Sequence, residues 1–201
     1  MLARVSNIEA YRRWQNWKPL HDDDEEPSLE QFVRSITTDE PSEAMKAGTA
    51  FHAAIEHAQD GEHSTFAAMG YTFHLPDAEI ALPTIREMRA FKPYGALAVT
   101  GKVDGIEGRT ITDYKTTGRC DAERYLEGCQ WKFYLDIFGA DVFVWQVFEI
   151  KEFEPFVYRV SAPQTIRAYR YPELPQDCAR LAEEYLDFAQ RVGLTNARIE
   201  D

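Results

Sequence analysis

A short stretch near the middle of the chain, GKVDGIEGRTITDYKTT from Gly101 to Thr117, has the pattern of a β-hairpin. Its centre, Glu107-Gly108-Arg109, is typical of a tight turn, because glycine tolerates the backbone angles that such turns need. Apolar residues flank the turn on both sides and predict strands that are at least half buried; they are Val103, Ile106, Ile111 and Tyr114. A chain with this hairpin is expected to build a sheet around it.

The rest of the chain alternates helical and strand patterns. Capping boxes at Ser6–Glu9 and Ser28–Gln31 predict the starts of two helices near the N-terminus. The expected helices cover residues 6–17, 28–36, 41–58, 121–138 and 175–193, and the expected strands cover 69–75, 78–82, 86–92, 97–107, 109–114, 141–150 and 153–160. This order predicts a mixed α/β fold, in which helices flank a central mixed β-sheet.

Composition excludes several classes of protein. The chain has 201 residues, which suits one domain, and no apolar run reaches the roughly 18 residues of a membrane span. The first residues lack the apolar stretch of a signal peptide. Three cysteines are too few for an all-cysteine iron–sulfur cluster and favour a reducing compartment. We therefore expect a cytoplasmic protein.

The charge of the chain is strongly negative but unevenly distributed. A net charge of −12 argues against a protein that coats nucleic acid by general electrostatic attraction, because phosphate contacts depend on lysine and arginine. Between Arg86 and Lys132, however, nine basic residues outnumber seven acidic ones. This middle segment is the part of the chain best suited to approach phosphates.

The hairpin carries two aspartates and a lysine. Asp104 and Asp113 lie equally far from a point between Gly108 and Arg109, so they face each other across a hairpin without a bulge. Opposed carboxylates about 5 Å apart repel each other unless they share a cation. Lys115 lies two residues beyond Asp113 and shares its face of the strand. This set suits metal-assisted phosphodiester cleavage, although a solvated hairpin with ordinary charges has the same residues.

Four motifs resemble those of the PD-(D/E)xK nuclease superfamily, in particular its RecB-like exonuclease branch. They are Gly48–His52 (GTAFH), Gly101–Asp104 (GKVD), Asp113–Lys115 (DYK) and Gln130–Tyr134 (QWKFY). Together they span residues 48–134 in the order of the family core. The resemblance implies a restriction-endonuclease-like core and one nuclease domain over 1–201, with a helical part over 1–60, a catalytic core over about 42–160 and a C-terminal helix over 175–193. Val103 stands where the superfamily name has proline.

The resemblance also implies a role for each matched residue. His52, Asp104 and Asp113 would bind the metal, with the backbone carbonyl of Tyr114 as a further ligand, and Lys115 would be the catalytic lysine. Gln130 and Tyr134, one helical turn apart, would contact DNA or position Lys115. Gly48 would let its helix approach closely.

Several of these residues have a simpler interpretation that the sequence leaves open. His52 alone would suit a hydrogen-bonded core histidine, and Gln130 and Tyr134 would also suit a helix face that packs on the sheet. Further candidates are Glu56 as an outer-shell ligand, Thr116 and Thr117 as phosphate contacts and Arg119 as a contact to the DNA backbone; each also suits a surface or strand-end position. His57 and His63 are expected on the surface.

The sequence therefore predicts a Mg²⁺- or Mn²⁺-dependent deoxyribonuclease that uses metal-activated water and forms no covalent intermediate. Exonuclease action on linear DNA in recombination or repair is favoured, because the chain is short and resembles a stand-alone phage-type exonuclease. A structure-specific or restriction-like endonuclease and a non-catalytic protein-binding module are the alternatives. DNA is the expected partner, a recombination or single-strand-binding protein is a further candidate, and an oligomer is left open. A bacterial or phage origin is expected.

Overall fold

The computed structural model describes residues 1–19, 25–38, 40–56, 65–76, 80 and 82–194. The strand expected over 78–82 falls largely outside these residues, as do His57, His63 and the end of the helix expected over 41–58. None of the described helices combines the length and the apolarity needed to cross a membrane.

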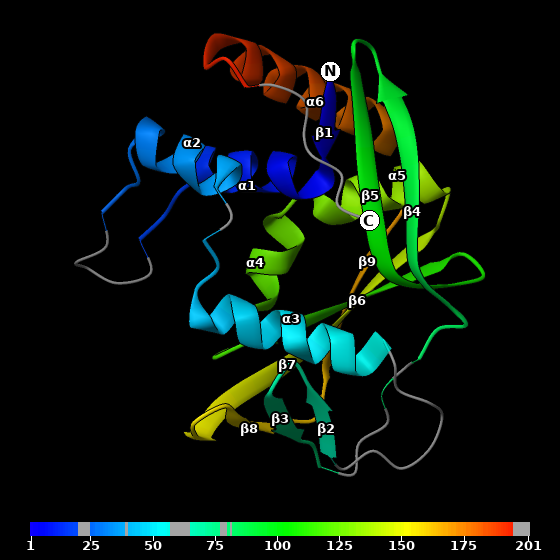
Figure 1. The fold of residues 1–201 in the computed structure, drawn as a ribbon. Helices are drawn as coiled ribbons and strands as arrows, with labels where there is room; N and C mark the ends of the chain where they lie inside the picture. The colour runs from blue at the N-terminus through cyan, green and yellow to red at the C-terminus, as the bar shows by residue number, and fades with distance from the viewer. Residues whose placement is uncertain (20–24, 39, 57–64, 77–79, 81, 195–201) are drawn as a thin grey trace.

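Helices and strands follow each other in mixed order along the chain (Figure 1). The described helices are α1 (Val5–Gln15), α2 (Leu29–Thr37), α3 (Glu43–Glu56), α4 (Ala122–Glu127), α5 (Gln130–Phe138) and α6 (Leu174–Arg191). The described strands are β1 (Leu2–Arg4), β2 (Thr65–Ala68), β3 (Tyr71–His74), β4 (Ile85–Tyr94), β5 (Leu97–Glu107), β6 (Thr110–Thr117), β7 (Val142–Glu154), β8 (Val157–Val160) and β9 (Gln164–Tyr169).

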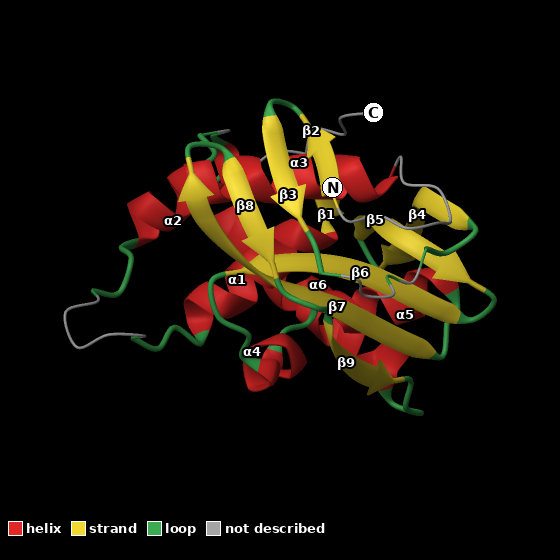
Figure 2. Ribbon diagram, turned by 90° about the horizontal axis from the view of Figure 1, so that it is seen from below, coloured by secondary structure: helices red, strands yellow, loops and turns green. Residues whose placement is uncertain are grey.

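The described strands form one mixed sheet. Their order is β1-β5-β6-β7-β8-β3-β2, while β4 pairs with β5 and β9 pairs with β7. The pairs β1–β5, β6–β7 and β3–β8 are parallel, and the other pairs are antiparallel. Helices cover both faces, as Figure 2 shows, and the predicted fold class of a central mixed sheet flanked by helices is confirmed.

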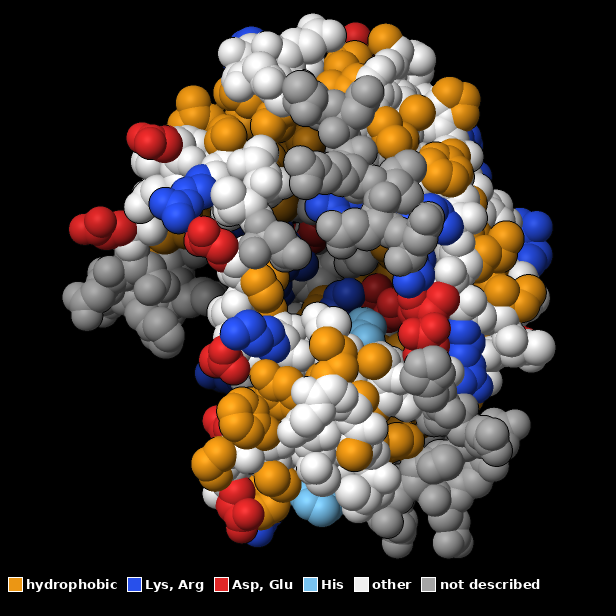
Figure 3. All heavy atoms as spheres, viewed as in Figure 1, with side chains coloured by type: hydrophobic (Ala, Val, Ile, Leu, Met, Phe, Trp, Pro, Cys, Tyr) orange, Lys and Arg blue, Asp and Glu red, His pale blue; other side chains and the backbone are white. Residues whose placement is uncertain are grey.

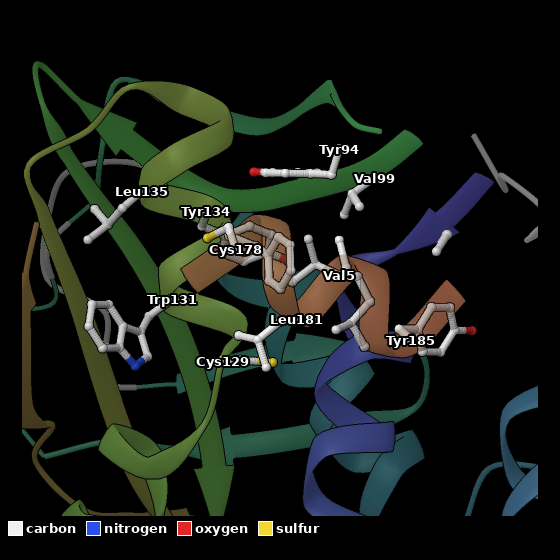
Figure 4. Packing of buried hydrophobic residues seen from close by; sticks show 14 of the residues in the cluster. Val5, Tyr94, Val99, Cys129, Trp131, Tyr134, Leu135, Cys178, Leu181 and Tyr185 are labelled. Carbon is white, nitrogen blue, oxygen red and sulfur yellow. The ribbon is translucent and has the colours of Figure 1, made fainter. Parts of the chain in front are cut away.

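Two hydrophobic cores lie on the two faces of the sheet. The larger core packs α1, α5 and α6 against β5, β6 and β7, and Figure 4 shows Val5, Tyr134 and Leu181 from these three helices together. The smaller core packs α3 against β2, β3, β8 and part of β7. Strand β7 serves both cores because successive side chains point to opposite faces: Val147 joins the larger core and Phe148 the smaller one.

Three parts of the secondary structure differ from the sequence prediction. Strands β1, β2 and β9 were missed, because three, four and six residues give little periodicity in a sequence. The helix expected over 121–138 is divided at Gly128 and Cys129 into α4 and α5. The expected Ser6–Glu9 capping box is also wrong. The helix starts after Arg4, whose backbone N–H donates to Asn7 Oδ1 at 3.3 Å, and Glu9 is engaged elsewhere.

Candidate active site

The site lies where β5 and β6 diverge. Strand β4 pairs along one edge of β5. On the other edge, residues 105–107 of β5 pair with β6 and residues 98–100 pair with β1. Residues 101–104 therefore lie between two ladders, and Asp104 is the last of them. Its carboxylate takes the place of a ladder partner, because Oδ2 accepts a 2.7 Å hydrogen bond from the backbone N–H of Tyr114.

Asp113 and Lys115 form an ion pair on β6, in which the carboxylate is buried. Asp113 is only 3% exposed, and Lys115 Nζ lies 2.9 Å from its Oδ1 and 2.8 Å from its Oδ2. Burial raises the pKa of Asp113 to about 6, an effect that Lys115 opposes and the negative charge of Asp104 reinforces. Although burial opposes the charge of Lys115, the same two carboxylates hold its pKa above the ordinary value. The lysine therefore remains a cation.

His52 approaches Asp104 from helix α3. It lies on α3, whose buried face packs into the smaller core through Ala47, Ala50, Phe51, Ala54 and Ile55. His52 Nδ1 is 3.4 Å from Asp104 Oδ2. Burial opposes a charge on either group, but their contact outweighs it, so the pKa of His52 is raised and that of Asp104 is lowered.

Helix α3 approaches β6 closely at Gly48. A Cβ atom on Gly48 would lie 3.1 Å from Thr116 Oγ1, which is tighter than an ordinary contact. Thr117 is occupied locally: its hydroxyl donates to the carbonyl of Arg119 at 2.8 Å and accepts from the Arg119 N–H at 3.3 Å. Thr116 thus borders the α3–β6 contact, while Thr117 shapes the turn that carries Arg119.

The far end of α3 is held by a residue that the sequence did not single out. Arg86 on β4 donates through Nη1 to the carbonyls of Ile55 at 3.4 Å and Glu56 at 2.8 Å. A guanidinium at this end complements the helix dipole and the free carbonyls of the last turn. Glu56 itself is exposed at the end of the helix. The contact joins residues about 30 positions apart, so no local sequence pattern predicts it.

Helix α5 covers the segment that ends at Asp104. The Tyr134 ring lies over Gly101, where a Cβ atom would come within 2.5 Å of the ring carbon Cε1. The Tyr134 hydroxyl donates to the Lys102 carbonyl at 3.0 Å, and Gln130 Nε2 donates to the same hydroxyl at 3.4 Å. Burial raises the pKa of Tyr134 to about 12, and the nearby charge of Asp113 adds to this effect. Tyr134 therefore contacts β5 directly, through its ring and through its hydroxyl.

Glu87 is a second feature that sequence reasoning missed. It lies on β4 between Arg86 and Met88, which pair with Gly105 and Val103, so its register position is opposite Asp104. Its backbone is left-handed, with φ of 54°, which is uncommon for a residue other than glycine. Its carboxylate pairs with Lys102 Nζ. A positive φ at a glutamate has no signature in the sequence.

The residues present fit a hard divalent cation. His52 Nδ1 lies 3.4 Å from Asp104 Oδ2, and the charges of both groups act on Asp113; carboxylate and imidazole are donor types that Mg²⁺ or Mn²⁺ accepts. Asp113 Oδ2 is buried, and among the described residues it contacts the Lys115 ammonium at 2.8 Å. Within the described part of the chain, no three His, Cys, Asp or Glu side chains close into a preformed metal cage. Mg²⁺ does not require one, because it commonly takes one or two carboxylates and completes its shell with water and substrate phosphate.

The site opens onto the surface. Figure 3 shows histidine, acidic and basic side chains together in a hollow beside α3. Of the residues predicted from the sequence, the structure brings together His52, Asp104, Asp113 and Lys115, with Gln130 and Tyr134 on the adjoining helix. It places Glu56 at an exposed helix end.

The overall fold is similar to that of a solved exonuclease structure. No protein-family model matches this chain, and no curated protein does either. An alkaline exonuclease, LHK-Exo, from Laribacter hongkongensis is 12% identical with a TM-score of 0.50, over 94% of this chain and 88% of that chain. The chain has an exonuclease-like fold. At this identity the likeness shows the fold alone.

Two further solved structures are similar at lower scores. SSO0001 is 14% identical with a TM-score of 0.49, over 93% of this chain and 75% of that chain. The complex of LHK-Exo with dAMP is 14% identical with a TM-score of 0.42, over 95% of this chain and 93% of that chain.

Proposed function

We propose that this protein is a divalent-metal-dependent deoxyribonuclease of the PD-(D/E)xK type, and that it acts as an exonuclease on linear DNA. One observation carries the proposal: the ion pair between the buried Asp113 and Lys115 lies beside Asp104 and His52 where β5 and β6 diverge. The fold shared with an alkaline exonuclease supports it. DNA recombination or repair is the process we propose for this activity.

In this proposal Asp104, Asp113 and His52 hold Mg²⁺ or Mn²⁺, and the Tyr114 carbonyl is a further ligand. The ion would supply Lewis-acid polarisation of the scissile phosphate and lower the pKa of the attacking water. The buried position of Asp113 excludes bulk water from one side of the site. That exclusion strengthens every charge interaction with the phosphate.

Lys115 acts as a charge rather than as a base. Its ammonium stays protonated between the two carboxylates, so it does not accept a proton from water near neutral pH. It is suited to stabilise negative charge that develops on the phosphate oxygens. The lysine is 28% exposed in its side chain, which leaves it accessible from the hollow.

Gln130 and Tyr134 lie between the proposed DNA-binding side of the site and strand β5. Tyr134 is buried and bound to the Lys102 carbonyl, so its hydroxyl orients the strand that ends in Asp104. Gln130 is partly exposed at the first turn of α5 and can meet the DNA. Arg119 follows β6 in a turn fixed by Thr117, where it can track the DNA backbone.

The test uses end-labelled linear duplex DNA and covalently closed circular DNA, each with Mg²⁺, Mn²⁺ or EDTA. We expect metal-dependent loss of the linear DNA alone, because an exonuclease requires an end. Cleavage of the circle would replace the exonuclease by an endonuclease. Absence of cleavage of both substrates, repeated with single-stranded DNA, would overturn the proposal. The Arg109→Ala variant is a matched control, because its exposed pair with Asp141 lies at the far end of the same hairpin.

A further inference from the structure

Glu9 is a buried acid on α1 whose carboxylate serves another helix. It is 7% exposed, and its Oε2 accepts hydrogen bonds from the backbone N–H groups of Cys129 at 2.6 Å and Gln130 at 2.9 Å. These groups belong to the first turn of α5, where Cys129 makes no side-chain cap of its own. The first N–H groups of a helix have no partner within the helix, and a carboxylate is favoured there by the helix dipole.

The position of this carboxylate is fixed from two further directions. Arg13, one turn later on α1, donates through Nε to Glu9 Oε1 at 2.6 Å. On the other side, a Cβ atom on Gly128 would lie 2.6 Å from Oε1 and 3.1 Å from Oε2. A side chain at position 128 would therefore displace the Glu9 carboxylate. Burial opposes the charge of Glu9, but Arg13 and the two N–H groups hold its pKa below the ordinary value.

Helix α5 links Glu9 to the candidate site. Gln130, whose N–H is bound by Glu9, donates through its side chain to the Tyr134 hydroxyl. Tyr134 donates to the carbonyl of Lys102, two residues before Asp104. A continuous series of hydrogen bonds thus runs from α1 to the strand that carries Asp104. The Tyr134 ring on Gly101 adds a steric contact that fixes the distance between α5 and β5.

We propose that Glu9 is a positioning residue of the nuclease site: it sets the orientation of α5 in which Gln130 and Tyr134 meet the Gly101–Asp104 segment. This inference rests on the proposed function. A positioning role differs from that of an ordinary helix cap. If Glu9 positions α5, its substitution should slow the reaction, and the size of this effect should depend on Gln130 and Tyr134. A cap that only stabilises the fold would leave the rate per folded molecule unchanged.

A double-mutant cycle on the full chain separates the two roles. Glu9→Gln is expected to lower kcat between about tenfold and a hundredfold, because a small displacement of reacting groups has effects of this size. In a Gln130→Ala, Tyr134→Phe background the same substitution should lower kcat less than about twofold, since the side-chain hydrogen bonds that link α5 to Lys102 are absent. Equal fold-losses in both backgrounds would overturn the proposal.

Two other variants control for loss of structure. Gly128→Ala leaves the Glu9 charge in place but displaces it sterically, so it should reproduce the loss of kcat. Ser28→Ala removes a comparable cap from α2, which carries no proposed site residue, and should lower Tm without changing kcat. If Gly128→Ala retains full kcat, or if Ser28→Ala loses as much as Glu9→Gln, positioning by Glu9 is contradicted.

Hydrogen exchange distinguishes failure of this inference from failure of the proposed function. Glu9→Gln should accelerate amide exchange at Cys129 and Gln130, and also at residues 102–104, whether or not the wild-type protein cleaves DNA. If the wild-type protein cleaves no DNA and exchange still rises at both places, the proposed function fails and the mechanical coupling stands. If exchange rises only at Cys129 and Gln130, Glu9 is a local cap and the proposal fails.

Discussion

The two faces of the sheet hold different parts of the candidate site. The face with the larger core carries α5, and through Tyr134 and Gly101 it controls the strand of Asp104. The face with the smaller core carries α3, which brings in His52 alone. The strand of Asp104 is fixed within the site itself, by the Tyr134 hydrogen bond and the ring contact on Gly101. His52 makes one 3.4 Å contact with Asp104, and its position depends on the packing of α3 in the smaller core.

The largest expected effect is on DNA cleavage, and it comes from Asp113 and Lys115 on β6. Asp113→Asn and Lys115→Met should each lower DNA cleavage by at least about a hundredfold, because each removes a charge from the reacting centre. Cleavage rates at saturating Mg²⁺ measure the effect, and circular dichroism confirms that the variants fold. Full activity in either variant would remove the pair from the reaction.

A comparison of two buried phenylalanines tests whether α3 depends on its core. Phe51→Leu in the smaller core and Phe188→Leu in the larger core should each cost about 1–2 kcal/mol of unfolding free energy. Only Phe51→Leu should also weaken metal binding, because Phe51 precedes His52 on α3. Urea denaturation measures the first effect, and Mn²⁺ titration followed by Tm measures the second. Equal metal affinity in both variants would show that His52 is held independently of the smaller core.

Two glycines compare the steric contacts on the two faces. Gly101→Ala should destabilise the protein by about 1–3 kcal/mol and reduce cleavage, because the new Cβ would lie 2.5 Å from the Tyr134 ring. Gly48→Ala should have a smaller effect, because its Cβ would lie 3.1 Å from a hydroxyl that can rotate away. Thermal unfolding and cleavage rates of the two variants give the order directly. A larger loss in Gly48→Ala would reverse the comparison of the two faces.

The smallest expected effect is on the stability of the fold at acid pH, and it concerns Asp136 on α5. The carboxylate of Asp136 is fully buried; burial alone would raise its pKa, but Lys92, Tyr94 and Arg170 hold it below the ordinary value. A lowered pKa stabilises the fold above the unfolded-state value of about 4, and this stability is lost as the pH falls through the lowered pKa. Asp136→Asn should therefore flatten the fall of Tm below pH 4. An unchanged slope would show that Asp136 does not link α5 to pH.

The hairpin shows how far local sequence carried the prediction. Asp104, Asp113 and Lys115 were placed from the turn and the two-residue period of a strand, and the structure brings the lysine to the second aspartate. The match holds because all three residues lie within twelve positions, where backbone geometry determines the relation. The mixed sheet followed from the order of elements for a similar reason.

The sequence by itself determined the longer elements and the charged residues of the hairpin, because these depend on neighbours along the chain. Only the tertiary structure decided what closes the gap beside Asp104. The parallel pairing of β1 with β5 joins residues 96 positions apart, and the hydrogen bond from Gln130 to Glu9 joins residues 121 positions apart. Such contacts form only when the two cores pack. Their free energy depends on burial between distant segments, which no single segment of the sequence determines.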